Sequence, residues 1–238
     1  MASGKLYLIP VPLAEGAEKA SYTILHQDII QSVDEYIVEN EKTARRFLKQ
    51  AGIKTPQSDL VIHDYGKHVR DKVNYNELFQ NLIAGKDVGL MSDAGCPGVA
   101  DPGAVIVAEA HKRGIHVCPL VGPSSILLAL MASGFNGQQF TFWGYLPIDK
   151  AARSQKIKSL ESASAKEHVS QIFIETPFRN NQLLEELLRT CKPTTKICVA
   201  CNLTADDELI ISQTVEHWKR RKPIDIHKKP TIFLLYAS

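Results

Sequence analysis

The sequence predicts an α/β protein of two α/β domains, the first with a mainly parallel sheet and the second with a mixed sheet. Short apolar runs alternate with helical patterns through residues 5–133, which is typical of βαβ units. The turn residues Gly134-Phe135-Asn136-Gly137 then interrupt this alternation. Beyond them several strand-like runs lack a helix between them, which indicates antiparallel pairs. The predicted domains are therefore 1–134 and 135–238, with a hinge between them.

Each element of the first domain has a local signal. Apolar runs mark the strands, while Gly52 and Gly114 end two of the helices. Asn74 and Glu77 form a capping pair where another helix begins. The predicted strands are 5–11, 36–38, 60–63, 87–92 and 116–121. The predicted helices are 21–33, 41–51, 74–84 and 104–113, with a fifth that begins at the turn Gly122-Pro123-Ser124-Ser125 and ends at Ser133.

The second domain is predicted from longer alternating runs and two helical patterns. Its expected strands are 140–146, 169–175, 197–202, 208–214 and 231–236, and its expected helices are 151–162 and 180–190.

Composition sets mild limits. The 238 residues, 44% hydrophobic and 23% charged, suffice for one large core or two modest ones. No apolar run approaches the roughly 20 residues that span a bilayer, and no signal-peptide core precedes the first strand. Five cysteines fit a reducing compartment better than a disulfide framework. We therefore expect a cytoplasmic protein, and a net charge of +2 says little about its partners.

The stretch from Ser92 to Gly103 is the most informative segment. It places three glycines, two prolines and two aspartates between a strand and a helix. Open α/β sheets bind ligands at such strand ends. The loop is expected to offer backbone amides at Gly95 and Gly98 and carboxylates from Asp93 and Asp101.

The turn from Gly122 to Ser125 adds hydroxyls and amides at a helix start. A helix start favours an anion, while carbonyls and carboxylates favour a cation. The two loops together suit a zwitterion with an extra positive centre, such as S-adenosylmethionine, although Asp and Gly in such loops also serve as turn and cap residues. The chain has no G-x-G-x-x-G motif and no phosphate-loop lysine.

These loops also resemble a known family. Residues 92–103, 119–125 and 132–134 look like the tetrapyrrole methylase (class III methyltransferase) superfamily. Phe142-Trp143-Gly144-Tyr145-Leu146-Pro147 and Glu175-Thr176-Pro177-Phe178-Arg179 match in the same order and spacing. The resemblance is strongest to RsmI-type enzymes, which methylate a ribose 2′-hydroxyl of a cytidine in small-subunit ribosomal RNA.

The resemblance implies a homodimer of two-domain chains that binds S-adenosylmethionine in the cleft between the domains. It also implies which residues border the cofactor. These are Pro12, Asp93, Ala94, Gly95, Val99, Ser124 and Ser125, with Glu175, Ala200, Asn202 and Leu203 on the second domain.

Several segments depart from the RsmI pattern. Residues 11–18 keep only a proline and one glycine of the family's T-P-I-G-N-L-G-D loop. Its E-D-T-R segment becomes Glu39-Asn40-Glu41-Lys42, with Arg45 matching a later arginine, and its R-E-L-T-K segment becomes Cys201-Asn202-Leu203-Thr204-Ala205. The chain also ends soon after Tyr236, before a C-terminal extension found in many relatives. These changes concern the RNA substrate more than the cofactor.

Methyl transfer needs alignment of its reactants more than acid-base strength. A ribose hydroxyl is a weak nucleophile, so a nearby acceptor would help. Asp93, Asp101, Glu39 and Glu175 are candidates for that role, while Arg45 and Arg179 suit an anionic substrate. For each of them a salt bridge or a loop cap is an equally good interpretation.

Other features fit structural interpretations better. Cys198 and Cys201 point to opposite faces of a strand, and the eight histidines show no H-x-x-x-H pair, so no metal site is expected. The basic run from Lys219 to Lys222, with Lys228 and Lys229 behind it, suits either RNA phosphates or a solvated edge. Trp143 and Trp218 suit packing more than base stacking.

Three functions remain open from the sequence. The chain is an RsmI-like ribosomal RNA methyltransferase, a methylase of a tetrapyrrole or other small anionic substrate, or a cofactor-binding protein without catalysis. A basic rim favours RNA, a deep trough favours a tetrapyrrole, and cofactor binding without turnover favours the third.

Overall fold

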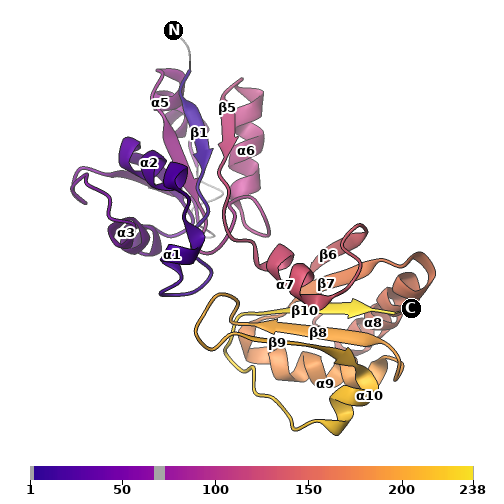
Figure 1. The fold of residues 1–238 in the computed structure, drawn as a ribbon. Helices are drawn as coiled ribbons and strands as arrows, with labels where there is room; N and C mark the ends of the chain where they lie inside the picture. The colour runs from indigo at the N-terminus through magenta and orange to yellow at the C-terminus, as the bar shows by residue number, and fades with distance from the viewer. Residues whose placement is uncertain (1–2, 67–72, 238) are drawn as a thin grey trace. The chain divides into compact units, whose positions relative to one another are not determined.

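The computed structural model describes residues 3–66 and 73–237. The chain forms two compact units, Met1–Ser124 and Ser125–Ser238 (Figure 1). The units therefore divide between Ser124 and Ser125, whereas the sequence predicts a hinge near Gly134. The helix α7 (Ser125–Ser133) accounts for this difference, because it packs against strands of the second unit.

The first unit contains a fully parallel five-stranded sheet in the order β3-β2-β4-β1-β5. All residues of β2 and of β4 are buried, whereas the edge strands β3 and β5 are half exposed. Buried central strands are expected in a parallel sheet that is covered on both faces. The strands are β1 (Lys5–Leu8), β2 (Glu35–Val38), β3 (Val61–Asp64), β4 (Val88–Met91) and β5 (His116–Pro119).

Helices cover both faces of this sheet. One core cluster joins Leu82 and Ile106 to the strand residue Leu90, and the other joins Ile30 and Leu48 to Met91. Side chains cap three of the helices, at Thr23, Asn40 and Asn74. The helices are α1 (Glu18–Ser21), α2 (Ile24–Ser32), α3 (Glu41–Gln50), α4 (Tyr75–Leu78), α5 (Gln80–Ile83) and α6 (Gly103–Lys112).

Two predicted helices are shorter or broken in the structure. The helix predicted over 21–33 begins at Ile24 because Thr23 is its cap, and α1 precedes it. The helix predicted over 74–84 is two short helices that meet at Phe79. The predicted strand 5–11 ends at Leu8, two residues before Pro10, which has no N–H to donate.

The second unit contains a mixed sheet in the order β6-β7-β10-β8-β9, so the predicted fold class is confirmed. Strands β6 and β7 are parallel and the other pairs are antiparallel. The ends of β6, β7 and β8 therefore share one edge with the start of β10. The strands are β6 (Phe140–Tyr145), β7 (Ser170–Ile174), β8 (Lys196–Cys201), β9 (Leu209–Thr214) and β10 (Thr231–Tyr236).

Helices also cover both faces of the second sheet. The main core cluster packs Ile157, Leu183 and Trp218 against Phe233, and α7 packs on β8, β9 and β10. The sequence did not predict α10, whose cap is the last residue of the preceding strand, Thr214. The helices are α8 (Lys150–Glu167), the short 3-10 helix η2 (Pro177–Arg179), α9 (Asn180–Thr190) and α10 (Val215–Arg220).

Candidate functional site

The loop that follows β4 is fastened to the segment that follows β1. The N–H of Val11 donates to the carbonyl of Gly95, and the N–H of Gly95 donates to the carbonyl of Val11, both at 3.0 Å. Gly95 has a φ of +74°, which favours glycine. The expectation that Gly95 offers a free amide is wrong, because Val11 uses that amide.

Asp101 closes the other half of this loop. Its Oδ1 accepts hydrogen bonds from the N–H of Gly103 at 2.6 Å and from the N–H of Gly98 at 2.9 Å. The amide of Gly98 is therefore also occupied within the protein, contrary to expectation. These contacts make Asp101 a loop cap, which is the structural interpretation that the sequence left open beside a catalytic role.

Four acids, Glu39, Asp64, Asp93 and Asp101, gather at the ends of β2, β3 and β4. Glu39 Oε2 accepts a hydrogen bond from the N–H of Asp93 at 3.2 Å. Partial burial, followed by the negative charges of Glu39 and Asp64, raises the pKa of Asp93. Partial burial also raises the pKa of Asp101, where the charge of Glu39 adds to the effect and the hydrogen bonds from Gly103 and Gly98 oppose it. A positive centre on a ligand would relieve this crowding of negative charge.

The loop that follows β5 passes close to the end of β1. A Cβ at Gly122 would lie 2.2 Å from Cβ of Pro10, so the approach requires glycine. The thiol of Cys96 donates to the carbonyl of Pro123 at 3.3 Å and joins this loop to the loop after β4. Ser124 ends the first unit, and Ser125 begins α7 of the second.

A pocket of about 130 Å³ opens beside these loops in the first unit. Its wall contains the predicted cofactor residues Pro12, Asp93 and Ala94, and α3 contributes Thr43 and Phe47. The structure therefore brings three of the predicted residues together. Three others of this unit are outside the wall, namely Gly95, Val99 and Ser124.

Arg45 has other partners on α3. Its Nε lies 2.8 Å from Oε1 of Glu41, and its Nη1 donates to the carbonyl of Gln57. These contacts fasten α3 to the segment before β3. They match the structural interpretation that the sequence left open, and neither partner is a predicted site residue.

In the second unit, Glu175 and Arg179 form an ion pair at the end of β7. Glu175 Oε1 accepts from the N–H of Thr176 and from Nη2 of Arg179, both at 2.6 Å, and its side chain is only 2% exposed. Nε of Arg179 is buried and has no hydrogen-bond partner among the described residues. Arg179 therefore keeps a donor that a ligand would satisfy.

Asn202 belongs to a polar network just after β8. Its Nδ2 donates to both carboxylate oxygens of Asp207 at 2.9 Å, and Lys229 Nζ donates to Asp207 Oδ2 at 2.9 Å. Thr204 adopts a φ of +70°, and its Oγ1 is buried without a hydrogen-bond partner among the described residues. Strained backbone of this kind concentrates at functional sites.

Ala200 and Leu203 differ from Asn202 in their burial. The side chain of Ala200 is 1% exposed inside β8, and that of Leu203 is 7% exposed. Both side chains are therefore packed in the protein, and contact with a ligand would use mainly their backbone groups.

Sequence reasoning did not single out Asp207 or Thr43. Asp207 joins Asn202, five residues before it, to Lys229, 22 residues after it. No helical or strand spacing connects these three positions. A hydrogen bond from Thr43 lowers the pKa of Asp93, and their separation of 50 residues likewise gives no local signal.

Within residues 3–66 and 73–237, no group of three His, Cys, Asp or Glu side chains has an arrangement that could hold a metal ion. Cys198 and Cys201 are free and buried. In the same ranges no helix combines the length and apolar character needed to cross a membrane.

A family model described as Tetrapyrrole (Corrin/Porphyrin) Methylases matches residues 5–218. The match spans both units and all of the predicted site residues. A likeness of fold is seen to the crystal structure of the methyltransferase CobJ, with a TM-score of 0.62, 18% identity, and coverage of 99% of this chain and 95% of that one.

Several curated relatives carry the name Ribosomal RNA small subunit methyltransferase I. The Vibrio cholerae protein is 30% identical over 205 residues, which cover 86% of this chain and 67% of the relative. A Synechocystis protein is 31% identical over 201 residues, with coverage of 84% and 67%. The Bacillus subtilis protein is 30% identical over 212 residues, with coverage of 89% and 68%.

Proposed function

Because this chain belongs to the tetrapyrrole methylase family, and within it to the group of its ribosomal RNA methyltransferase relatives, we propose that it methylates small-subunit ribosomal RNA. The chain is a methyltransferase. The acceptor that we propose is a ribose 2′-hydroxyl of a cytidine, and the proposed donor is S-adenosylmethionine. The relatives favour RNA over the tetrapyrrole alternative.

One observation carries this proposal. Relatives about 30% identical over most of the chain share one name, and the family match over residues 5–218 includes the loops of both units. The altered segments at residues 11–18 and 201–205 therefore lie within a chain that otherwise keeps the pattern of these relatives.

The residues present suit a sulfonium ligand. S-adenosylmethionine supplies a methyl group on a positively charged sulfur. The crowded carboxylates of Glu39 and Asp93 favour a positive centre nearby. The buried Oγ1 of Thr204 has no hydrogen-bond partner among the described residues, and a ligand would provide one. The proposed cofactor residues are Pro12, Asp93, Ala94, Gly95, Val99, Ser124, Ser125, Glu175, Ala200, Asn202 and Leu203.

We assign different parts to the four proposed catalytic residues. Glu39 accepts a hydrogen bond from the acceptor hydroxyl and so aligns its lone pair for in-line attack. Arg179, held by Glu175, binds a phosphate of the substrate. Asp101 and Arg45 act as positioning residues, because their contacts shape the loop after β4 and fasten α3.

The test combines binding with product mapping. Calorimetry with S-adenosylmethionine and S-adenosylhomocysteine measures cofactor binding, and small ribosomal subunits from cells lacking the gene serve as acceptor. We expect one new ribose methyl group per subunit, lost in Glu39→Gln. Methylation of a porphyrinoid but not of RNA would refute the proposed acceptor, and cofactor binding without any product would indicate a binding protein.

We also propose that the protein is a cytoplasmic homodimer. Met131 on α7 and Tyr145 on β6 are exposed apolar side chains of the second unit, which suits contact with a second copy. Light scattering at several protein concentrations tests this, and a mass of one chain throughout would refute it.

A further inference from the structure

The end of α10 and the irregular segment that follows it carry an unusual density of positive charge. Residues 219–229 contain six lysines and arginines and a single acid, Asp225. Lys219, Lys222 and Lys228 are exposed and form no ion pair with other described residues. An unpaired cationic segment of this kind is suited to a polyanion.

This segment is fixed against α9. Asn181 donates from Nδ2 to Asp225 at 2.8 Å and accepts from the N–H of Ile226 at 3.0 Å. Asn180 donates to the carbonyl of Lys229 at 2.7 Å. The basic residues are therefore held in place by the fold, which reduces the entropy lost when they bind a ligand.

The first half of the segment borders a groove of about 440 Å³ against α9. Leu184, Leu188 and Ile224 give the groove an apolar lining, and its charged lining residues are three basic side chains and one acid, Glu185. Arg221 places its guanidinium 5.0 Å from the Trp218 ring centroid, and its Nε is buried without a partner among the described residues. The basic lining residues are Lys219, Arg221 and Lys222.

The second half of the segment reaches the edge that holds Glu175 and Arg179. The N–H of Lys228 donates to the carbonyl of Pro177 at 2.9 Å. Phe178, beside it, is 65% exposed, with the Lys228 ammonium 5.8 Å from its ring centroid and the His227 ring at 5.9 Å. An exposed aromatic ring beside a lysine ammonium is suited to stacking with a nucleobase.

Resting on the proposed function, we propose that Lys219, Arg221, Lys222, Lys228 and Phe178 form a binding track for single-stranded RNA beside the methylated nucleotide. The groove holds backbone phosphates, and Phe178 stacks with a base near Arg179. Asn181 lines the groove and lies three residues after Phe178, so the start of α9 connects the two ends of the track. Neither end is among the proposed cofactor residues.

The test measures the affinity of the full chain for a labelled RNA of about 16 nucleotides between about 50 and 200 mM salt. In Lys219→Ala/Lys222→Ala, loss of two phosphate contacts should reduce the slope of log affinity against log salt by about 1.4. Phe178→Ala should weaken binding on the order of tenfold without changing that slope. Lys158→Ala/Lys166→Ala removes the same charge from exposed positions of α8 and serves as the matched control.

An equal salt slope in Lys219→Ala/Lys222→Ala and in the control variant would overturn the track. Displacement of the labelled RNA by an acidic peptide but not by unlabelled RNA would overturn it as well. S-adenosylhomocysteine binding should be unchanged in all three variants, and its loss in Phe178→Ala would assign this residue to the cofactor instead. If the wild-type protein methylates small subunits but Lys219→Ala/Lys222→Ala leaves the salt slope unaltered, the track alone is refuted. Lysine-dependent RNA binding without a methyl product refutes the proposed function alone.

Discussion

At the scale of single residues, neighbouring acids of one loop have different surroundings. Asp101 accepts two backbone hydrogen bonds within the loop, whereas Asp93 lies beside Glu39 and Asp64. The same residue type therefore fixes a backbone in one position and concentrates negative charge in the other. Electrostatic attraction for a positive ligand is expected at Asp93.

Asp93→Asn should weaken binding of S-adenosylmethionine about tenfold and affect S-adenosylhomocysteine much less, because the sulfur of S-adenosylhomocysteine is a neutral thioether and only S-adenosylmethionine carries a sulfonium charge. Because its pKa is raised, Asp93 takes up a proton at a higher pH than an ordinary aspartate. Wild-type affinity for the sulfonium ligand should therefore fall as the pH is lowered through that range.

Calorimetry at several pH values measures both effects. Asp28→Asn, an exposed position on α2, is the matched control and should bind as wild type does. An equal loss of affinity for both ligands in Asp93→Asn would contradict an electrostatic role for Asp93.

At the scale of elements, α2 is joined to the end of β1 by a buried histidine. Nε2 of His26 donates to the carbonyl of Pro10 at 2.8 Å, and the ring stacks on Tyr22. Burial lowers the pKa of His26, opposed by the hydrogen bond to Pro10. The neutral ring is therefore the form that supports the first loop.

The unfolded chain takes up a proton on His26 near pH 6.5, while the folded protein does so only at lower pH. The free energy of unfolding should therefore decrease as the pH falls below about 6.5. His26→Gln keeps a donor for Pro10 but does not titrate, so this dependence should become shallower. Urea unfolding at pH 7.5, 6.5 and 5.5 tests this, because these values bracket the usual histidine pKa of about 6.5. The same change of unfolding free energy with pH in wild type and in His26→Gln would refute it.

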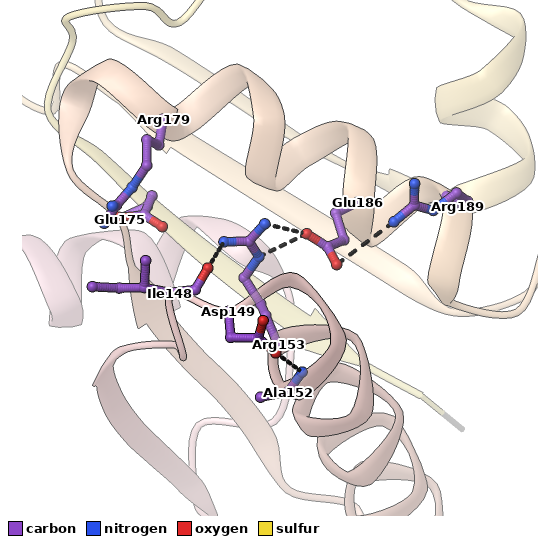
Figure 2. A network of polar contacts seen from close by, with 8 residues as sticks. All are labelled: Ile148, Asp149, Ala152, Arg153, Glu175, Arg179, Glu186 and Arg189. Atoms are coloured by element: carbon purple, nitrogen blue, oxygen red, sulfur yellow. Dashed lines mark hydrogen bonds and ion pairs between the residues drawn. The ribbon is translucent and has the colours of Figure 1, made fainter.

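A buried ion pair joins α8 to α9 (Figure 2). Arg153 donates from Nε to Glu186 Oε2 at 2.6 Å and from Nη1 to the carbonyl of Ile148 at 3.2 Å. The two side chains of the pair are 11% and 4% exposed, and Glu186 also lies 3.6 Å from Arg189. Removal of one partner would leave a buried charge uncompensated.

Arg153→Met or Glu186→Leu alone should therefore cost about 3 to 5 kcal/mol of unfolding free energy, and the double variant should recover much of that loss. Chemical denaturation of all four proteins gives the coupling energy. Additive losses would show that the pair does not act as a unit.

At the scale of the whole molecule, each unit has its own sheet and its own core. The proposed cofactor residues are divided between the two units. Hydrogen exchange with and without S-adenosylhomocysteine should therefore show protection in peptides covering 92–103 and also in peptides covering 201–208. The C-terminal half of α6 in the first unit and α8 in the second serve as internal references. Protection in only one unit would contradict the assignment.

The sequence by itself determined the alternation of elements, the two sheet types and the loops that carry the family resemblance. These features depend on periodicity and on turn residues, which are local. It also predicted α9 at its observed bounds and missed only the short α10 and η2 among the described helices of the second unit.

Only the tertiary structure decided which polar groups are already occupied. The amide of Gly95 binds Val11, Arg45 binds the carbonyl of Gln57, and Asp207 joins Asn202 to Lys229. It also decided that α7 packs with the second unit. Each of these outcomes depends on partners brought together by the packing of sheets and helices, and no local spacing in the sequence records such partners.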